Sequence, residues 1–445
     1  MVSGAKTRKR STAVAQEDVS VSTPKTERTQ KKGGVTDATS LPLNGLQEVM
    51  VKAIGAGETG AGDAFDLCIV PAVHHNASDI HFEPWEDCLS VRYRLDGILH
   101  EIARIPKQYQ ERFIARIKIL AKMVVYQKNV PQDGRIDGES ARGGYALRIS
   151  TFPTIYGEKT VVRIIGANRQ RLQLDRLGFR RESVKALQRV IGLPQGTILL
   201  TGPSSAGKTT TIYSMINELI THVRPGANVV TIEDPVEYKL GPVAQTQINP
   251  AAGFTFDQAL RSILRQDPEV IMVGEIRDSE TAHLAIQAGL TGHLVISTIH
   301  SGTAPGVFTR LLDMSVEPYL VASSISAVLA QRLVRLNCEQ CKEQYTPMQS
   351  LYARFGIPQE TPLYKGKGCS KCDGIGYKGR TAIGELLTVN TELAELILQR
   401  TRTRLLHEAA VRNKMVTLSR HGTAKAVKGL TTLEELERVL PVMGG

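Results

Sequence analysis

The chain has 445 residues, of which 42% are hydrophobic, and it carries a formal net charge of +11. This length and composition fit a soluble globular protein of two or three domains, and no apolar run reaches the ~18 residues that a membrane-spanning helix needs. The basic start is not followed by an apolar core, which excludes a secretory signal peptide and favours a cytoplasmic protein.

The first 40 residues form a basic tail. They hold 8 Lys and Arg against 4 Asp and Glu, and large apolar residues are almost absent. This composition predicts disorder for residues 1–45. A basic tail can contact nucleic acid or anionic lipid, but we favour a solubilising role. The remaining charge is spread thinly over the rest of the chain, so no specific nucleic-acid partner is expected.

Residues 46–168 are expected to form a small α/β domain. The first part reads as a helix followed by strands, with period-2 alternation in LSVRYRL and a turn at Asp96-Gly97. A second group of strands and turns is expected later in this segment and ends near Ile165. Residues 169–182 are predicted to be a linker. Between the two groups of strands, KQYQERFIARIKILAKM has helical spacing of its apolar residues Phe113, Ile114, Ile117 and Leu120.

Short apolar strands alternate with helices in residues 183–336. TILLT, NVVTIE, VIMVGE and HLVIST are typical of a parallel sheet that is buried on both faces. The run YLVASSISAVLA, from Tyr319 to Ala330, is predicted to be a buried or interfacial helix. We expect a four-cysteine element at 337–380 and a helical region at 381–445. The last helix, in TTLEELERVLPVM, has a threonine that can cap it and a glutamate three residues later.

The pattern Gly202-x-x-x-x-Gly207-Lys208-Thr209 is that of a phosphate-binding loop, and it follows a strand and opens a helix as the pattern requires. Backbone N–H groups would cradle the phosphates, Lys208 would neutralise the β- and γ-phosphates, and Thr209 would ligate Mg²⁺. The alternative is a chance glycine-rich turn before a helix. We predict a site for ATP and Mg²⁺ formed by Gly202, Pro203, Ser204, Ser205, Ala206, Gly207, Lys208, Thr209 and Thr210.

Two acidic segments follow the loop. VVTIEDPVEY places Glu233 and Asp234 just past a strand, and EVIMVGEIRD places Glu275 just past another. The carboxyl ends of parallel strands line the ligand crevice, so one carboxylate can hold the Mg²⁺ shell while the other orients the attacking water. Either acid alone fits a solvated loop, but both together with the loop favour a catalytic site.

Four of the six cysteines form two Cys-x-x-Cys pairs, CEQC and CSKC. Disulfides, which the cytosol disfavours, and a redox pair are the alternatives to a metal site. Cys68 and Cys88 stand alone and are expected to be plain buried thiols. The paired spacing predicts tetrahedral Zn²⁺ in a structural site with no open position, held by Cys338, Cys341, Cys369 and Cys372.

Four segments resemble the Walker A, Asp, Walker B and His boxes of the type II secretion and type IV pilus assembly ATPases. They are TGPSSAGKTTTIYS, TIEDPVEY, LRSILRQDPEVIMVGEIRD and AGLTGHLVISTIHSGTAPGVFTRLLDM, while SDIHFEP, VRYRLDG and PQDGR resemble the family's preceding domain. The resemblance covers roughly Ala64 to Leu440. It implies a PAS-like N-terminal α/β domain joined to a RecA-like P-loop ATPase domain, with a four-cysteine zinc element and a helical C-terminal region.

The same resemblance implies a function and partners. The chain would hydrolyse ATP as a homohexameric ring, peripheral on the cytoplasmic face of the inner membrane, and would drive type II secretion or type IV pilus assembly. An inner-membrane platform protein and a cytoplasmic-face docking protein would be its partners. By the resemblance, Glu233 is the base, Glu275 is the Walker B acid, and His300 links nucleotide state to movement.

Four arginines are candidates for the border between subunits. Arg135 in PQDGR and Arg148 in LRIST match family positions that reach the nucleotide. Arg261 and Arg265 lie four residues apart on a predicted helix and share one of its faces. A surface ion pair is the alternative for any of them.

The chain departs from the family at Ser205 and Ala206, where glycine and serine are usual. Glycine accepts positive φ freely and serine does not, so a strained or slow loop is expected. The His box continues as HSGTA where Thr-Asn-Asp-Ala is usual, and the tail stands in place of the separate domain that many members use for docking. The competing hypotheses are a ring ATPase for conjugative DNA transfer and a catalytically weak ring subunit.

Overall fold

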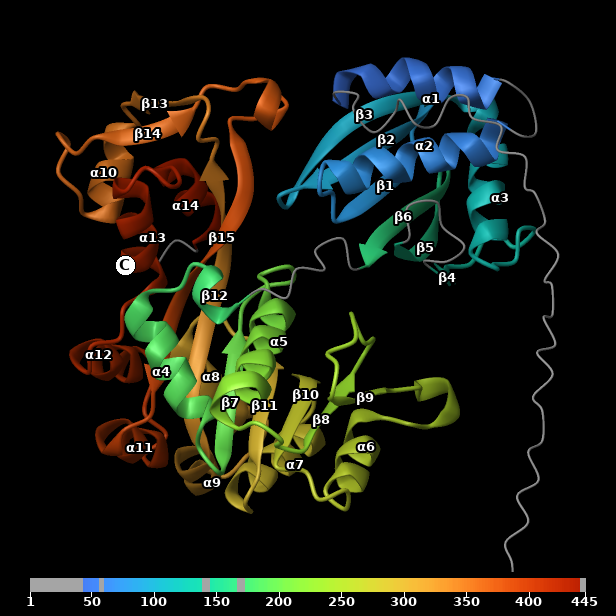
Figure 1. Ribbon diagram of the computed structural model, residues 1–445. Coiled ribbons are helices and arrows are strands. Elements are labelled where there is room, and N and C mark those ends of the chain that lie inside the picture. Colours follow the sequence, from blue (N-terminus) through green and yellow to red (C-terminus); the bar gives the residue numbers. More distant parts are fainter. Residues whose placement is uncertain (1–42, 56–59, 138–144, 166–172, 441–445) are drawn as a thin grey trace, which may run out of the picture.

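The computed structural model describes residues 43–55, 60–137, 145–165 and 173–440. These residues form an N-terminal α/β domain and a larger α/β domain (Figure 1). The predicted basic tail, apart from its last three residues, and part of the predicted linker lie outside the described residues. None of the described helices has the length and apolar character that crossing a membrane requires.

The N-terminal domain is built on a six-stranded antiparallel sheet with the order β3-β2-β1-β6-β5-β4. In β2, Val91, Tyr93 and Leu95 are buried while Arg92 and Arg94 are partly exposed, which confirms the predicted alternation. The strands are β1 (Asp79–Pro84), β2 (Cys88–Leu95), β3 (Ile98–Pro106), β4 (Gln132–Ile136), β5 (Ala146–Thr154) and β6 (Gly157–Ile165).

Helices cover one face of this sheet (Figure 1). The helix predicted from apolar spacing is α3, whose Phe113, Ile114 and Ile117 are buried. Cys68 and Cys88 are free and buried, as expected, and burial raises the pKa of both thiols. The helices are α1 (Leu46–Gly55), α2 (Gly60–His74) and α3 (Gln110–Leu120), with 3₁₀ turns at Leu43–Gly45 and Lys107–Tyr109.

The second domain has a seven-stranded sheet with the order β15-β12-β7-β11-β10-β8-β9, parallel except for the edge strand β15. The four predicted strands correspond to β7, β8, β10 and β11. The strands are β7 (Gly196–Thr201), β8 (Val229–Glu233), β9 (Ala244–Gln247), β10 (Val270–Ile276), β11 (Leu294–Ile299), β12 (Ile325–Asn337) and β15 (Tyr377–Thr388).

Successive residues of the central strands pack into two different cores. Leu199 and Ile271 belong to the core on one face, while Leu200 and Met272 belong to the core on the other. Helices on both faces explain why these strands are apolar throughout. The helices before β12 are α4 (Arg181–Ile191), α5 (Lys208–Glu218), α6 (Phe256–Ile263), α7 (Ser279–Leu290), α8 (Ala304–Asp313) and α9 (Pro318–Ser324), with 3₁₀ turns at Leu174–Arg176 and Pro250–Ala252 and a π-helical turn at Leu219–Val223.

The predicted helix from Tyr319 to Ala330 is wrong in its second half. Helix α9 ends at Ser324, and strand β12 begins at Ile325 between β7 and β15. A short run of Ala, Ser, Val and Leu does not distinguish helix from strand by its period. Pairing with a strand on each side satisfies the backbone of β12 and decides its conformation.

The chain beyond β12 forms a small cysteine-bearing element and a group of helices. Thr432 caps the last helix, as predicted, and its Oγ1 accepts from the Glu435 backbone N–H at 3.1 Å. The elements are β13 (Lys342–Tyr345), α10 (Gln349–Phe355), β14 (Leu363–Gly366), a 3₁₀ turn at Ser370–Cys372, and α11 (Thr391–Leu398), α12 (Thr403–Arg412), α13 (Leu418–Val427) and α14 (Leu433–Val439).

Candidate functional site

The predicted phosphate-binding loop joins β7 to α5. A Cβ atom at Gly202 would lie 2.5 Å from the carbonyl oxygen of Gln331, so only glycine fits there. Ser205 adopts a φ of +62°, in the left-handed region. A non-glycine residue in that region costs roughly 1 kcal/mol. Serine is therefore strained at this position, where the family usually has glycine.

Lys208 lies across the loop at the start of α5. Its Nζ donates to the carbonyl oxygens of Gly202 at 2.8 Å and Pro203 at 3.1 Å. Burial lowers the pKa of this ammonium group, and the charge of Glu275 acts in the opposite direction. An ammonium group held at a helix N-terminus, where backbone N–H groups point out of the helix, suits the phosphates of a nucleotide.

Two residues of β12 that sequence reasoning missed bond to the loops of the site. Gln331 Nε2 donates to the Ala206 carbonyl oxygen at 2.7 Å, and Arg332 donates to the Gly302 carbonyl oxygen at 3.0 Å. Arg332 is buried, which lowers its pKa. The local sequence LAQRLVRL has no regular alternation that would have singled out these two residues. These bonds connect β12 to both the phosphate-binding loop and the loop after His300.

Glu275 and His300 meet beside Lys208. The Glu275 carboxylate lies 3.7 Å from His300 Nε2 and also pairs with Arg277, a residue that was not predicted. Glu275 is the acid whose charge acts on Lys208. The strand ends of β10 and β11 therefore bring the predicted Walker B acid and the predicted His-box histidine to the phosphate-binding loop.

Glu233 ends β8 and is buried, with 2% of its surface exposed. Its Oε1 accepts from Thr231 at 2.5 Å and from Gln245 at 3.0 Å, and its Oε2 accepts from the Tyr213 hydroxyl. The carboxylate is thus fixed by neighbours on three elements of the same domain. The structure places it next to α5, the helix that Lys208 opens.

Arg135 and Arg148 lie directly opposite each other on β4 and β5, and Arg163 of β6 continues the row. Paired residues point to the same face, and all three are exposed. The pKa of Glu237, in the loop after β8, is raised by burial and lowered by the charges of Arg163 and Arg148. Arg163 and Arg148 of the N-terminal domain therefore lie close enough to Glu237 of the larger domain for their charges to act on it.

Arg261 and Arg265 do not come together as a pair on one helix. Helix α6 ends at Ile263, so Arg265 lies beyond it and donates to the Arg261 carbonyl oxygen at 2.9 Å. Arg261 forms an exposed ion pair with Glu280 at 2.7 Å. Within one chain, the contact of Arg261 with Glu280 is the kind of surface ion pair that was the alternative to a role at the subunit border.

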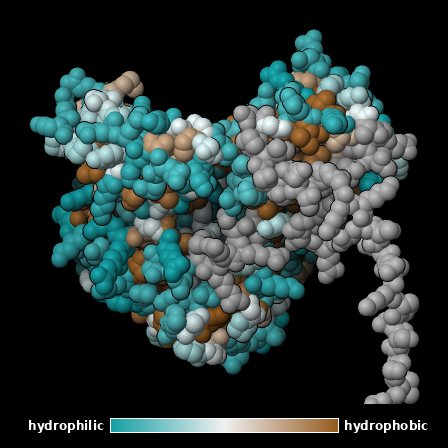
Figure 2. Space-filling model, turned by 45° about the horizontal axis from the view of Figure 1, so that its top comes forward, coloured by the Kyte–Doolittle hydropathy of each residue, from teal (hydrophilic) through white to brown (hydrophobic). Residues whose placement is uncertain are grey.

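A cleft of about 860 Å³ separates the N-terminal domain from the larger domain beside the loop. Gly207 and Thr210 line it on one side and Asn76 and Leu95 on the other. In Figure 2, where the top of the molecule is turned forward, a notch lies between its two upper parts. The cleft gives a nucleotide bound at the loop room between the two domains.

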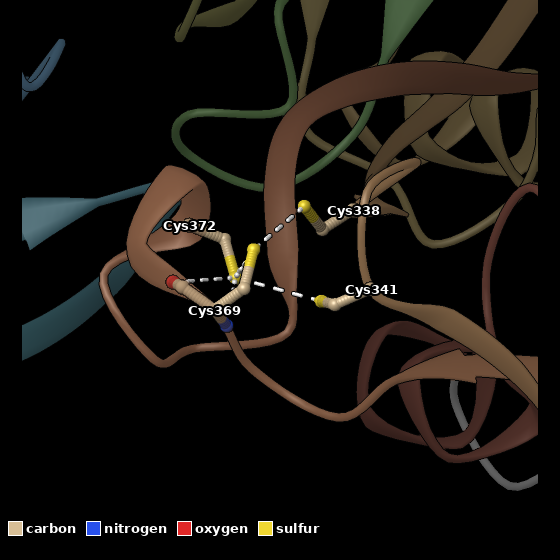
Figure 3. A group of neighbouring side chains, drawn as sticks. All are labelled: Cys338, Cys341, Cys369 and Cys372. Atoms are coloured by element: carbon tan, nitrogen blue, oxygen red, sulfur yellow. Dashed lines mark hydrogen bonds between the residues drawn. The ribbon is translucent and has the colours of Figure 1, made fainter.

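The four predicted cysteine ligands converge (Figure 3). Their sulfur atoms all lie within 4.8 Å of one another, and three Sγ–Sγ distances are 3.8 Å. Four sulfurs about 2.3 Å from one Zn²⁺ ion would be about 3.8 Å apart at the edges of a tetrahedron. All four thiols are free, and backbone N–H groups of Gly368 and Gly376 donate to sulfur, which suits thiolate ligands. The residues fit the ion.

Comparison with known proteins gives matches over most of the chain. Residues 63–438 match the family described as "Type II/IV secretion system protein". The Type II secretion system ATPase E of Vibrio cholerae is 44% identical over 370 residues, which are 83% of this chain and 73% of that protein. The Type IV pilus assembly ATPase PilB of Thermus thermophilus is 42% identical over 394 residues, 88% of this chain and 44% of that protein.

Solved structures share the fold. The Legionella pneumophila ATPase DotB superposes with a TM-score of 0.62 at 20% identity, covering 84% of this chain and 94% of that one. The pilus retraction motor PilT with bound ADP gives a TM-score of 0.56 at 24% identity, covering 84% and 95%. These similarities confirm the expected α/β architecture with a RecA-like ATPase fold.

Proposed function

Because the chain belongs to the family of type II/IV secretion system proteins, we propose that it is a motor ATPase that drives type II protein secretion or type IV pilus assembly. The observation that carries the proposal is the meeting of Glu275 with His300 at the strand ends beside Lys208 of the phosphate-binding loop, whose Gly207 and Thr210 line the cleft. The reaction is hydrolysis of ATP to ADP and phosphate.

Each side chain of the site would have its own role in phosphoryl transfer. Lys208 would leave its two carbonyl partners and bind the β- and γ-phosphates, which its charge complements. Thr209 and Glu275 would hold Mg²⁺, which neutralises developing negative charge. Glu233 orients the attacking water as the base. His300, in contact with Glu275, would sense the change at the γ-phosphate.

The zinc assignment rests on the tetrahedral arrangement of Cys338, Cys341, Cys369 and Cys372. Four thiolates fill the coordination sphere of Zn²⁺ and leave no position for a substrate. The ion would therefore stabilise the element at 337–380 and take no part in hydrolysis.

The ring and its partners are part of the proposal. Arg135 and Arg148 belong to a different domain from the phosphate-binding loop, and such arginines suit a nucleotide held between moving parts. We propose a homohexamer, peripheral on the inner membrane, that contacts a membrane platform protein and a docking protein on the cytoplasmic face. Its domains would be the tail 1–45, the domain 46–168, the linker 169–182, the ATPase core 183–336, the zinc element 337–380 and the helical region 381–445.

A catalytically weak ring subunit is the second candidate, and Ser205 is the observation that favours it. Its left-handed φ of +62° is costly for serine and free for glycine. Serine therefore makes this loop conformation less stable than glycine would, by roughly 1 kcal/mol. A hydrolysis assay separates this candidate from a working motor.

Replacing Lys208 with Ala should abolish ATP hydrolysis because it removes the countercharge of the β- and γ-phosphates. Glu233→Gln should still bind ATP but turn over slower by a factor on the order of 10² or more. Phosphate release by the purified assembled protein measures both rates. Lys185→Ala, at an exposed position on α4, is the matched control and should behave as wild type. Wild-type turnover in Glu233→Gln would show that another group is the base.

A further inference from the structure

Within the part of the chain that the structure describes, the donors around Glu233 leave its carboxylate a single free acceptor position. A carboxylate offers about four lone-pair sites, two on each oxygen. Thr231 and Gln245 occupy Oε1, and Tyr213 occupies one site of Oε2. One lone pair remains, on Oε2. A water molecule that Glu233 binds is therefore restricted to one direction.

The Tyr213 hydroxyl is a permanent donor in this arrangement. Tyr213 is 1% exposed, and burial followed by the bond to Glu233 raises its pKa well above the usual value for a phenol. Its ring packs edge-on against Tyr238, with centroids 4.6 Å apart. The phenol stays protonated and cannot swing away, so its bond to Glu233 persists.

Gln245 is held so that its nitrogen faces the carboxylate. Its Oε1 accepts from the Leu240 backbone N–H at 2.8 Å, which fixes which end of the amide is oxygen. Its Nε2 donates to Glu233 at 3.0 Å and approaches the Tyr213 hydroxyl at 3.4 Å. Tyr213, Gln245 and Glu233 thus form one connected network across α5, β9 and β8.

Helix α5 connects this network to the phosphates. Lys208 opens the helix, and Tyr213 lies five residues further along the same helix, about 7.5 Å along its axis. A rigid helix keeps that spacing constant. The element that binds the phosphates therefore also sets the position of the carboxylate that faces the attacking water.

We propose that Tyr213, assisted by Gln245, is a positioning residue for hydrolysis: it holds Glu233 so that its one free lone pair orients the attacking water relative to phosphates bound at the start of the same helix. The inference rests on the proposed function, in which Glu233 acts on the water. It adds two residues that do not touch the nucleotide.

Tyr213→Phe should lower kcat by roughly tenfold or more and leave KM for ATP unchanged, because misplacement of a catalytic group by part of an ångström is that costly while phosphate contacts are intact. Introduced into Glu233→Gln, the same change should cause no further loss, since the two residues act as a unit. Initial rates of phosphate release by the assembled full-length protein measure all four members of this cycle.

Tyr345→Phe is the matched control, because the Tyr345 hydroxyl donates to Glu434 at 2.6 Å, far from the loop in the sequence and in a different part of the fold. It should leave kcat and KM unchanged. If Tyr213→Phe does not fold, Gln245→Leu takes its place in the cycle, because it removes another donor that holds the Glu233 carboxylate.

A wild-type kcat in Tyr213→Phe would overturn the inference, and so would an equal loss of kcat in both backgrounds. A rise in KM alone would also overturn it. Failure of the proposed function gives a different result, because the wild type would then not hydrolyse ATP or would be no faster than Glu233→Gln. That result would remove the positioning role together with the role of Glu233.

Discussion

Lys425 is a buried ammonium group whose hydrogen-bond partner among the described residues is a hydroxyl group. It lies on α13 and donates to Thr381 Oγ1 at 2.8 Å. Burial, reinforced by the nearby charge of Lys428, lowers its pKa from the ordinary 10.5 to about 8. At neutral pH the folded protein must therefore keep a charge in a poorly solvated place.

Lys425→Met should stabilise the protein at pH 7. The unfolded chain binds the lysine proton up to about pH 10.5, while the folded chain releases it near pH 8. Between these values the unfolded state binds more protons, so the stability of the wild type rises with pH across this window. The gain from the substitution should be on the order of 2 kcal/mol at pH 7 and should shrink between pH 8 and 10.5.

Urea unfolding of the two proteins at pH 7 and pH 10 measures that difference. Lys185→Met, at an exposed site, should change the free energy of unfolding little at either pH. A Lys425→Met protein that is less stable than wild type at pH 7 would mean that the ammonium group is well solvated.

The cysteine element, residues 337–380, has the arrangement expected where a metal ion would take the place of an apolar core. Its two short strands β13 and β14 form a two-stranded sheet, and the four cysteines are the members of its own small cluster. Two strands alone are marginally stable in water. An ion held by the four cysteines, together with packing on neighbouring elements, would supply the energy to hold this element.

Cys369→Ser should release zinc, of which the wild type is expected to contain about one ion per chain. The segment from Leu336 to Gly379 should then be the first to become sensitive to protease, and ATP binding should survive better than ring function. Elemental analysis and limited proteolysis test this. Cys88→Ser, outside the cluster, should keep its zinc. Unchanged protection of the segment in metal-free protein would make the four cysteines ordinary core residues.

Sequence patterns predicted the elements that are determined by residues close together in the sequence. The phosphate-binding loop, the strands β7, β8, β10 and β11, and the convergence of the cysteines all follow from motifs or from uniformly apolar runs. The strand β12 was missed because its pairing with β7 and β15 is decided by residues distant in sequence. Gln331 and Tyr213 were missed for the same reason, since nothing in the local sequence says what a polar side chain on a buried face will meet.

At the scale of the whole molecule, the N-terminal domain rests on the cysteine element. Asp96 accepts from the Gly379 backbone N–H at 2.8 Å and pairs with Arg380 at 3.3 Å, and His75 Nδ1 lies 3.1 Å from Asp373. These contacts close one side of the cleft beside the phosphate-binding loop. Movement between the domains would therefore open or close the nucleotide site.

Arg148→Ala should lower turnover without unfolding the chain. Arg148 belongs to the exposed row of arginines, its charge acts on Glu237, and by the proposed function it would act on a nucleotide or a neighbouring subunit. The ATPase rate and the thermal unfolding midpoint are the two measurements. Arg116→Ala, exposed on α3, is the control and should have the wild-type rate. An unchanged rate in Arg148→Ala would limit the row to a structural role.

We propose that this chain is an ATP-hydrolysing motor that works as a ring. The most direct test is the rate of ATP hydrolysis per subunit over a wide range of protein concentration, with the mass of the assembly measured in the same samples. The rate per subunit should be low in the monomer, rise steeply as six-subunit rings form, and then become constant. A fully active monomer, or rings that do not hydrolyse ATP at any concentration, would contradict the claim.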